Sequence, residues 1–394
     1  MILIATSLFP PEPVVSANIS YDLAMVLSED NEVAVISPKP TRPHGMRFKY
    51  IPHKNKFNHV ILDSYTSSQS NIIGRLLESY SLGKHISKYI ENNKDKIKVV
   101  YANVWPIFSQ YALAKKCIEH KIPYIIHVQD IYPESLTNKL PFLGRTLYSL
   151  LIHLDKYTLL NAEKCISISE QMRNHLISTR KLKDSNVSVV RNWQNDDAFN
   201  GGTITTEDIN IDEKYFNYVY LGSINPTAGV DLLINSFAKA KLDNSCLTIA
   251  GNGSDKDRCI KIARSHNCRI NFIDARQSQV PYIQSKADIL LLPLRKNIAS
   301  TAFPSKLTAY MLSGKPIIAT VEIESEIAQA IIKNNCGWIS KPEDVDQLAD
   351  LMKKVQSIPK EVLAKLGDNS LIFAKNNLSR KINLEKLTQI IKEA

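Results

Sequence analysis

The sequence predicts an α/β protein built from two doubly wound parallel-sheet domains in tandem. Short apolar runs alternate with segments of helical periodicity along all 394 residues, a pattern typical of repeated βαβ units. A chain of this length also exceeds what one hydrophobic core usually serves, which favours two domains. Hydrophobic residues make up 44% and charged residues 22% of the chain, the composition of an ordered globular protein.

The first half contains seven apolar runs that we interpret as strands. They cover residues 1–7, 33–37, 60–62, 98–101, 124–127, 164–167 and 187–190. Helical patterns lie between them at residues 17–27, 72–91, 106–120 and 143–160. This order predicts a first domain over residues 1–195.

The segment from residue 192 to residue 212 loses periodicity and gathers Asn, Asp, Gly and Thr, so we expect a linker over residues 196–212. A second domain is expected over 213–375, with a C-terminal helix over 376–394 that returns to the first domain. Its strands are expected at residues 218–221, 245–250, 270–272, 289–293, 316–320 and 337–339. Ligands bind at the carboxyl ends of such sheets, which we expect to face a common cleft.

Composition narrows the function classes. The six cysteines are scattered without metal-ligand spacing, which indicates a reducing compartment and neither a zinc site nor a disulfide framework. No secretory signal or apolar stretch of about 20 residues is found, so we expect a cytoplasmic protein that is either soluble or peripheral at the inner face of the cell membrane. The net charge of +10 favours an anionic partner, and without an interleaved basic and aromatic array nucleic acid is the weakest candidate.

Two polar loops follow predicted strands of the first half. The segment Ser7-Leu8-Phe9-Pro10-Pro11-Glu12 precedes a helix whose free N–H groups favour an anion, although a tight strand-to-helix turn accounts for it equally well. The segment from His127 to Ser135 places polar residues just past a strand, where substrates lie. There we expect Asp130 to orient or deprotonate an acceptor hydroxyl, and Glu134 either to act beside it or to cap a helix.

Two further segments belong to the second half. Gly222-Ser223-Ile224-Asn225 follows a strand, and its N–H groups suit phosphate oxygens. Gly251-Asn252-Gly253 follows the next strand, but by itself such a turn is weak evidence. In the segment from Thr301 to Pro316, Pro304 suits the first helical turn, so the N–H groups of Ser305, Lys306 and Leu307 are expected to form an anion site with the Lys306 charge.

In this order, the segments resemble the bacterial retaining glycosyltransferases of the group 1 type (family four), especially those of the capsule, colanic-acid-like exopolysaccharide and O-antigen branch. The resemblance rests on "FPPE", "DIYPES", "ISEQM", "RNW", the Gly222 loop and above all "PSKLTAYMLSGKP". It implies a GT-B fold of two Rossmann-like domains. The N-terminal loop (Pro11, Glu12, Ser16, Asn18) and Gln129 are then expected at the acceptor side. The donor side is then expected to be formed by Gly222, Ser223, Asn225, Gly251, Gly253, Pro304, Ser305, Lys306 and Leu307.

The chain departs from this family at four charged positions. Ser223 and Ala228 stand where relatives carry phosphate-binding cations, and Thr301 and Ala309 where relatives carry two glutamates. The second glutamate usually binds ribose, so ribose recognition must come from elsewhere or be weaker.

The resemblance implies a metal-independent, hexosyltransferase-type enzyme with no cofactor, with Asp130, Glu134 and Lys306 at the reacting centre. We interpret the two Asp-x-Asp patterns at residues 255–257 and 344–346 as helix caps and not as a metal site. The implied partners are a nucleotide-sugar donor, a polyprenyl-diphosphate-linked saccharide and an anionic membrane surface. The helix at 143–160 either rests on that surface or is an ordinary partly buried helix.

Two other functions remain open at this point. One is a non-catalytic GT-B partner in a polysaccharide complex, and the other is a GT-B sugar-nucleotide epimerase. The nucleotide base, the sugar, the acceptor, the linkage and the oligomeric state do not follow from the sequence.

Overall fold

The computed structural model describes residues 1–42, 48, 56–67, 72–104, 107–137, 144–193, 196–199, 209–296 and 305–394. The chain forms two compact units. Unit 1 comprises Met1–Asn192 together with Asn383–Ala394, and unit 2 comprises Trp193–Ile382. Most of the expected linker lies outside the described residues.

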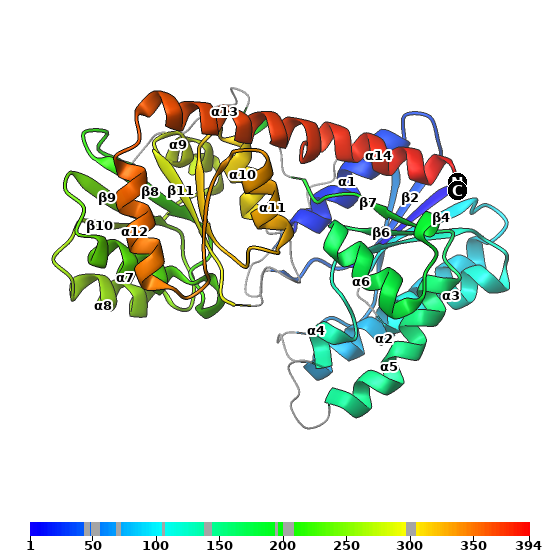
Figure 1. The fold of residues 1–394 in the computed structure, drawn as a ribbon. Helices are drawn as coiled ribbons and strands as arrows, with labels where there is room; N and C mark the ends of the chain where they lie inside the picture. The colour runs from blue at the N-terminus through cyan, green and yellow to red at the C-terminus, as the bar shows by residue number, and fades with distance from the viewer. Residues whose placement is uncertain are drawn as a thin grey trace. The chain divides into compact units, whose positions relative to one another are not determined.

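Unit 1 contains a seven-stranded parallel sheet in the order β3-β2-β1-β4-β5-β6-β7 (Figure 1). Its strands are β1 (Ile2–Thr6), β2 (Val33–Pro38), β3 (Asn58–Leu62), β4 (Val99–Asn103), β5 (Tyr124–Val128), β6 (Lys164–Ser167) and β7 (Val187–Val189). Its helices include α1 (Val15–Leu27), α2 (Ile72–Asn93), α3 (Phe108–Glu119), α4 (Glu134–Thr137), α5 (Gly144–Leu160) and α6 (Glu170–Arg180). The strands form where the apolar runs predicted them, because a strand covered on both faces needs apolar residues throughout.

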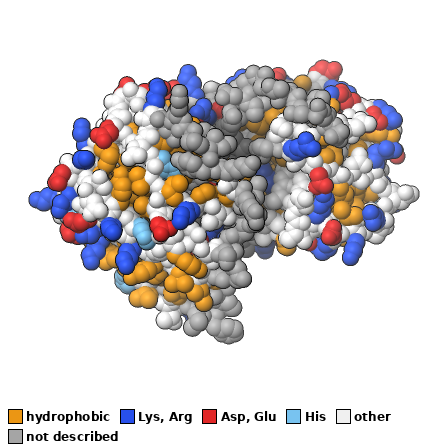
Figure 2. Space-filling model, turned by 180° about the vertical axis from the view of Figure 1, so that it is seen from behind, with side chains coloured by type: hydrophobic (Ala, Val, Ile, Leu, Met, Phe, Trp, Pro, Cys, Tyr) orange, Lys and Arg blue, Asp and Glu red, His pale blue; other side chains and the backbone are white. Residues whose placement is uncertain are grey.

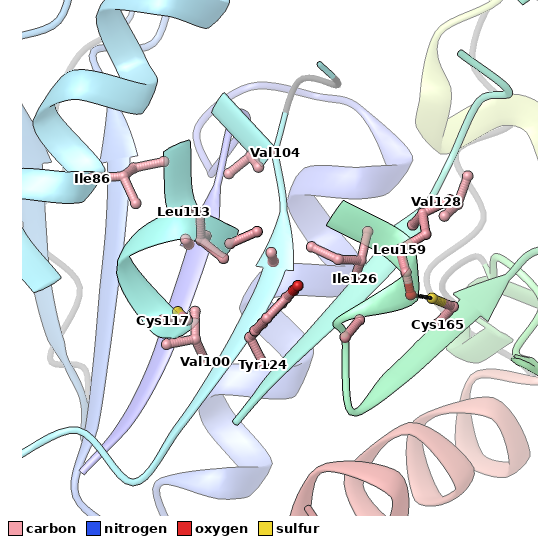
Figure 3. Close-up of a cluster of buried hydrophobic side chains, with 14 of the residues drawn as sticks. Ile86, Val100, Val104, Leu113, Cys117, Tyr124, Ile126, Val128, Leu159 and Cys165 are labelled. Atoms are coloured by element: carbon pink, nitrogen blue, oxygen red, sulfur yellow. Dashed lines mark hydrogen bonds between the residues drawn. The ribbon is translucent and has the colours of Figure 1, made fainter. Parts of the chain in front are cut away.

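The core of unit 1 lies between this sheet and a layer of helices. Leu82 and Ile86 of α2, Leu113 of α3 and Leu159 of α5 pack against alternate strand residues such as Ile126. Figure 3 shows Ile86, Leu113 and Leu159 of these helices together with Ile126 of the sheet. This packing fixes α2, α3 and α5 on one face.

Unit 2 contains a six-stranded parallel sheet in the order β10-β9-β8-β11-β12-β13. The strands are β8 (Phe216–Leu221), β9 (Ser245–Ala250), β10 (Ile270–Ile273), β11 (Ile289–Pro293), β12 (Ile317–Thr320) and β13 (Gly337–Ser340). The helices include α7 (Val230–Ala240), α8 (Lys256–Arg264), α9 (Val280–Ser285), α10 (Ser305–Leu312), α11 (Glu326–Lys333), α12 (Val345–Gln356), α13 (Lys360–Asn377) and α14 (Arg380–Lys392). The last residues of α14 belong to unit 1.

Alternate residues of the unit 2 strands build two cores. Val219, Leu290 and Leu292 face α9, α10 and α11, whereas Tyr218 and Leu291 face α7, α8 and α12. The expected α/β class with two doubly wound parallel sheets is therefore confirmed.

Several helices begin at side-chain caps. The Ser169 hydroxyl accepts a hydrogen bond of 3.1 Å from the Met172 N–H at the start of α6. Asp344 caps α12 by accepting a hydrogen bond of 2.9 Å from the Gln347 N–H, as expected for the second Asp-x-Asp pattern. Asp255 occupies the same position before α8 without a side-chain cap and pairs with Arg258 instead.

Candidate functional site

Each sheet has one point where successive connections run in opposite directions. It lies between β1 and β4 in unit 1 and between β8 and β11 in unit 2. In open α/β sheets, ligands bind outside the carboxyl ends of the strands at this point. Most of the predicted site residues lie at these two sheet edges.

In unit 2, Lys306 is the second residue of α10. Its ammonium donates a hydrogen bond of 2.7 Å to the Tyr220 hydroxyl and lies 4.7 Å from the centre of that ring. Burial lowers the pKa of Lys306 to about 8. A weakly solvated cation at the start of a helix is a favourable site for phosphate, because the helix N–H groups and the charge act on the same ligand.

The loop after β8 lies against both Lys306 and the loop after β9. A Cβ added to Gly222 would lie 2.2 Å from Lys306 Cε, and one added to Gly251 would lie 2.0 Å from the Gly222 carbonyl oxygen. Gly253 is equally close to the Ile224 carbonyl oxygen, at 2.1 Å. All three glycines have positive φ between 144° and 156°, so they permit a close approach that any side chain would block.

The expected phosphate cradle of N–H groups is only partly available. The N–H groups of Gly222 and Ile224 donate to the carbonyl oxygens of Ala250 and Asn252, each at 2.9 Å. The Asn225 side chain caps a short helical turn at Pro226–Ala228 by accepting from Thr227 N–H at 3.1 Å. A phosphate in this loop therefore cannot use the N–H groups of Gly222 and Ile224.

A cation that the sequence reasoning missed lies beside the same turn. Arg295, just after β11, donates from Nε to the Pro226 carbonyl at 3.2 Å and from Nη2 to both Asp231 carboxylate oxygens at 2.7 Å. No local pattern marks Arg295, since it reaches the turn only when β11 pairs with β8.

Of the two positions where relatives carry glutamate, Ala309 lies within the described residues and Thr301 does not. Ala309 is 5% exposed in α10, so its position contributes an apolar side chain to the core. Thr301 and Pro304 lie outside the described residues, and Ser305 is described by its backbone alone. Leu307 is fully buried in the core beneath the site.

Unit 1 has a pocket of about 100 Å³ at its own switch point, here called the unit 1 pocket. Its lining comes from the loop after β1, the first turns of α1 and α2, the end of β4, α3, and the loop after β5. The residues are Ser7, Leu8, Ser16, Arg75, Asn103, Val104, Gln110, Gln129, Asp130 and Tyr132. Three predicted residues, Ser16, Gln129 and Asp130, therefore come together, whereas Arg75, Asn103 and Gln110 were missed.

Asp130 is exposed, and one carboxylate oxygen accepts from the Ile131 N–H at 2.9 Å. The Gln129 side-chain oxygen accepts from the Asn192 amide at 2.8 Å. His127, by contrast, is 1% exposed inside β5, with Nδ1 2.6 Å from the Tyr101 hydroxyl. Asp130 is thus the carboxylate of this loop that lines the unit 1 pocket.

Glu134 lies in an ion-pair network. Its carboxylate accepts hydrogen bonds from both terminal nitrogens of Arg180, at 2.5 and 2.7 Å, and lies 3.0 Å from His175 Nε2. Burial raises the pKa of Glu134, but the hydrogen bonds from Arg180 and His175 lower it to about 2. Arg180 is fully buried and also pairs with Asp155 at 2.8 Å. The geometry therefore gives Glu134 a structural role, and its catalytic role stays a prediction.

The Glu12 carboxylate is also engaged in hydrogen bonds within the protein. It is 3% exposed and accepts backbone hydrogen bonds from Thr41 and Arg42, at 2.8 and 2.9 Å. Burial raises its pKa, against these hydrogen bonds. Glu12, Pro11 and Asn18 do not line the unit 1 pocket, so Glu12 holds the loop and does not face a ligand there.

Within the described ranges, the one group with metal-ligand spacing is Glu91, Glu119 and His120. Lys116 pairs with both carboxylates, each at 2.9 Å. These residues lie at the C-terminal ends of α2 and α3, at the sheet edge opposite the unit 1 pocket. In the described part of the chain, no helix has the length and apolar character that crossing a membrane requires.

Two family models match consecutive parts of the chain. "Glycosyltransferase Family 4" matches residues 17–197, and "Glycosyl transferases group 1" matches residues 203–371. Together these matches cover most of the chain and show that it belongs to the glycosyltransferases, and its two parallel sheets form the GT-B fold. No curated protein sequence matches the chain.

Solved structures share this fold over the whole chain. Sucrose-phosphate synthase from Thermosynechococcus elongatus has a TM-score of 0.76 at 14% identity, covering 100% of this chain and 98% of that one. Anabaena Alr3699/HepE in complex with UDP has a TM-score of 0.71 at 13% identity, with both chains fully covered. WaaG, a glycosyltransferase involved in lipopolysaccharide biosynthesis, has a TM-score of 0.66 at 15% identity, also with both chains fully covered.

Proposed function

We propose that this protein is a retaining, metal-independent hexosyltransferase of bacterial surface polysaccharide biosynthesis. It moves a sugar from a nucleotide-diphosphate sugar to a polyprenyl-diphosphate-linked saccharide at the inner face of the cell membrane. The observation that carries the proposal is the Lys306 ammonium at the start of α10, against Gly222 at the unit 2 switch point. Structures of Alr3699/HepE hold UDP and UDP-glucose, which supports a nucleotide-sugar donor.

The chemistry follows from what this arrangement stabilises. When the glycosidic bond of the donor breaks, negative charge develops on the diphosphate, and Lys306 with the first N–H groups of α10 stabilises that charge. In unit 1, Asp130 orients the acceptor hydroxyl or accepts its proton, and the amides of Asn103, Gln110 and Gln129 supply hydrogen bonds to a sugar.

Exposed apolar side chains of α2 and α5, here called the apolar surface, support the proposal of a lipid-linked acceptor. These side chains are Ile73, Leu77, Tyr80, Leu150, Tyr157 and Leu160. Two acidic residues of these helices are buried, Glu78 of α2 and Asp155 of α5. Glu78 is the acidic residue of α2 up to residue 90, and Asp155 is the acidic residue of α5. Basic side chains on these helices include Lys84, Lys88, Arg145 and Lys156. Figure 2 shows apolar side chains gathered on the lower part of unit 1, and an apolar surface with basic and no exposed acidic groups suits an anionic leaflet.

The first experiment is a thermal-shift panel of UDP, GDP, dTDP and CMP with their sugars, since a ligand that binds only the folded state raises the melting temperature. One nucleotide is expected to stabilise the wild-type chain. Lys306→Ala is expected to lose the shift, and Lys333→Ala, an exposed lysine at the end of α11, is expected to keep it. A normal shift in Lys306→Ala would disprove the diphosphate site.

Turnover then separates the proposed transferase from the two other functions. Release of sugar with retained anomeric configuration supports transfer. Under the proposal, Asp130→Asn strongly reduces this release and leaves the nucleotide affinity unchanged. Nucleotide binding without turnover supports the non-catalytic partner, which the apolar Ala309 and the uncharged Ser223 favour. Conversion of the donor without any acceptor identifies an epimerase.

A further inference from the structure

The first turn of α2 carries a cation on the side of the helix that faces the sheet. Positions 75, 79, 82, 86 and 90 form one row along α2, and the last three are core residues, Leu82, Ile86 and Ile90. Arg75 begins this row but is exposed and lines the unit 1 pocket. A charged residue on a core-facing row needs a polar environment, which the unit 1 pocket provides.

Arg75 is not the partner of the nearby acid on α2. Glu78 is 4% exposed and pairs with Arg42 at 2.7 Å. Arg75 instead lies beside Tyr132: burial and Asp130 raise the pKa of the Tyr132 hydroxyl, while Arg75 acts in the opposite direction. The lining of the pocket thus includes a carboxylate and a guanidinium, both of which act on Tyr132.

The opposite face of the same helical segment is apolar. Ile73 is 72% and Leu77 51% exposed, in line with Tyr80 one turn later. Ile72 and Leu76 pack instead against the buried cluster of Ile107, Leu136 and Leu151, so the end of α2 separates the pocket from the apolar surface by one helix width, about 10 Å. A ligand with an anionic group and a long apolar chain spans that distance.

We propose that Arg75 binds a phosphate of the lipid diphosphate on the acceptor. The apolar chain of the lipid then extends over Ile73 and Leu77. This inference rests on the proposed function, since it assigns the phosphate subsite of its acceptor. A guanidinium is suited to this group because its planar donors bond two phosphate oxygens at once.

Farnesyl diphosphate is a suitable probe, tested on the full chain by calorimetry with saturating UDP so that the unit 2 site is filled. Arg75→Gln is expected to raise its dissociation constant at least about tenfold, the effect of losing a charge-assisted hydrogen bond. Lys115→Gln, at an exposed lysine of α3 outside that apolar surface, is the control and is expected to change it less than about twofold. Farnesol, which lacks the diphosphate, is expected to bind all three chains equally.

An unchanged affinity of Arg75→Gln for farnesyl diphosphate overturns the proposal, and so does an equal loss for farnesol. Phosphatidylglycerol vesicles form a separate arm. If Arg75→Gln weakens vesicle binding alone, the anion is a lipid headgroup and the acceptor subsite is wrong. Failure of the proposed function gives a different result. In that case the chain turns over no nucleotide sugar but still binds farnesyl diphosphate through Arg75.

Discussion

Lys306 shows how burial at a single residue makes ligand binding pH-dependent. Burial lowers its pKa to about 8, and only the ammonium form attracts a diphosphate. As pH rises through about 8 the charge is lost, so UDP affinity is expected to fall up to about tenfold per pH unit above that value. The measurement is calorimetry between pH 7 and 10, where the nucleotide phosphates are already ionised. Lys306→Ala is expected to bind weakly with no such fall, and an identical pH profile in both chains would contradict the assignment.

Glu134 is the residue for which structure and catalysis give different expectations. Glu134→Gln leaves the fully buried Arg180 with less compensation for its charge, which is expected to cost about 3 kcal/mol of unfolding free energy. Because the folded pKa lies below the unfolded value of 4.5, this contribution is present above pH 4.5 and is lost as pH falls towards 2.

Urea unfolding at pH 7 and at pH 3 measures this contribution. Asp184→Asn, which removes an exposed pair with Arg173, is expected to have no resolvable effect. Full stability with lost turnover in Glu134→Gln would instead assign the residue to catalysis.

Which residues could be predicted depends on whether their role is local. Ser169 and Asp344 were predictable as caps, because a cap is defined by a hydrogen bond two or three residues away. Lys306 was predictable because the helix start and its charge are adjacent in sequence. Arg75 and Arg295 could not be found, since the residues they meet, Tyr132 and Asp231, lie 57 and 64 positions away along the chain.

At the scale of elements, the two loops after β8 and β9 are expected to act as one unit. Gly251→Ala places a Cβ 2.0 Å from the Gly222 carbonyl oxygen, so the backbone must shift and carry the loop away from Lys306. We expect lower stability together with at least about tenfold weaker UDP binding, the loss of roughly one charge-assisted contact.

Gly314→Ala is the matched control for the loop prediction. It also has a positive φ, 66°, but its nearest contact is 3.8 Å away. It is expected to cost about 1 kcal/mol of backbone strain at unchanged UDP affinity. Equal loss of UDP binding in both variants would show that general destabilisation, and not the loop contact, causes the effect.

The elements themselves were largely predictable. The thirteen strands of the described residues lie where the apolar runs predicted them, with shifts of one or two residues at their ends, because parallel strands covered on both faces cannot include many polar residues. The short helix α4 has only four residues, too few to show helical periodicity, and was not expected.

For the whole molecule, the end of the chain is expected to stabilise unit 1 specifically, because Asn383–Ala394 belong to that unit although α14 begins in unit 2. Leu384, Leu387 and Ile391 are at most 7% exposed, and Asn383 accepts from the Arg191 N–H at 3.0 Å. Burial of three such side chains contributes about 5 kcal/mol. Removing residues 383–394 is therefore expected to speed amide exchange in β6, β7 and α6, with exchange in the unit 2 strands unchanged. Lys392→Ala removes only an exposed pair with Asp30 and is expected to change neither, whereas faster exchange in unit 2 after truncation would show that the segment stabilises both units.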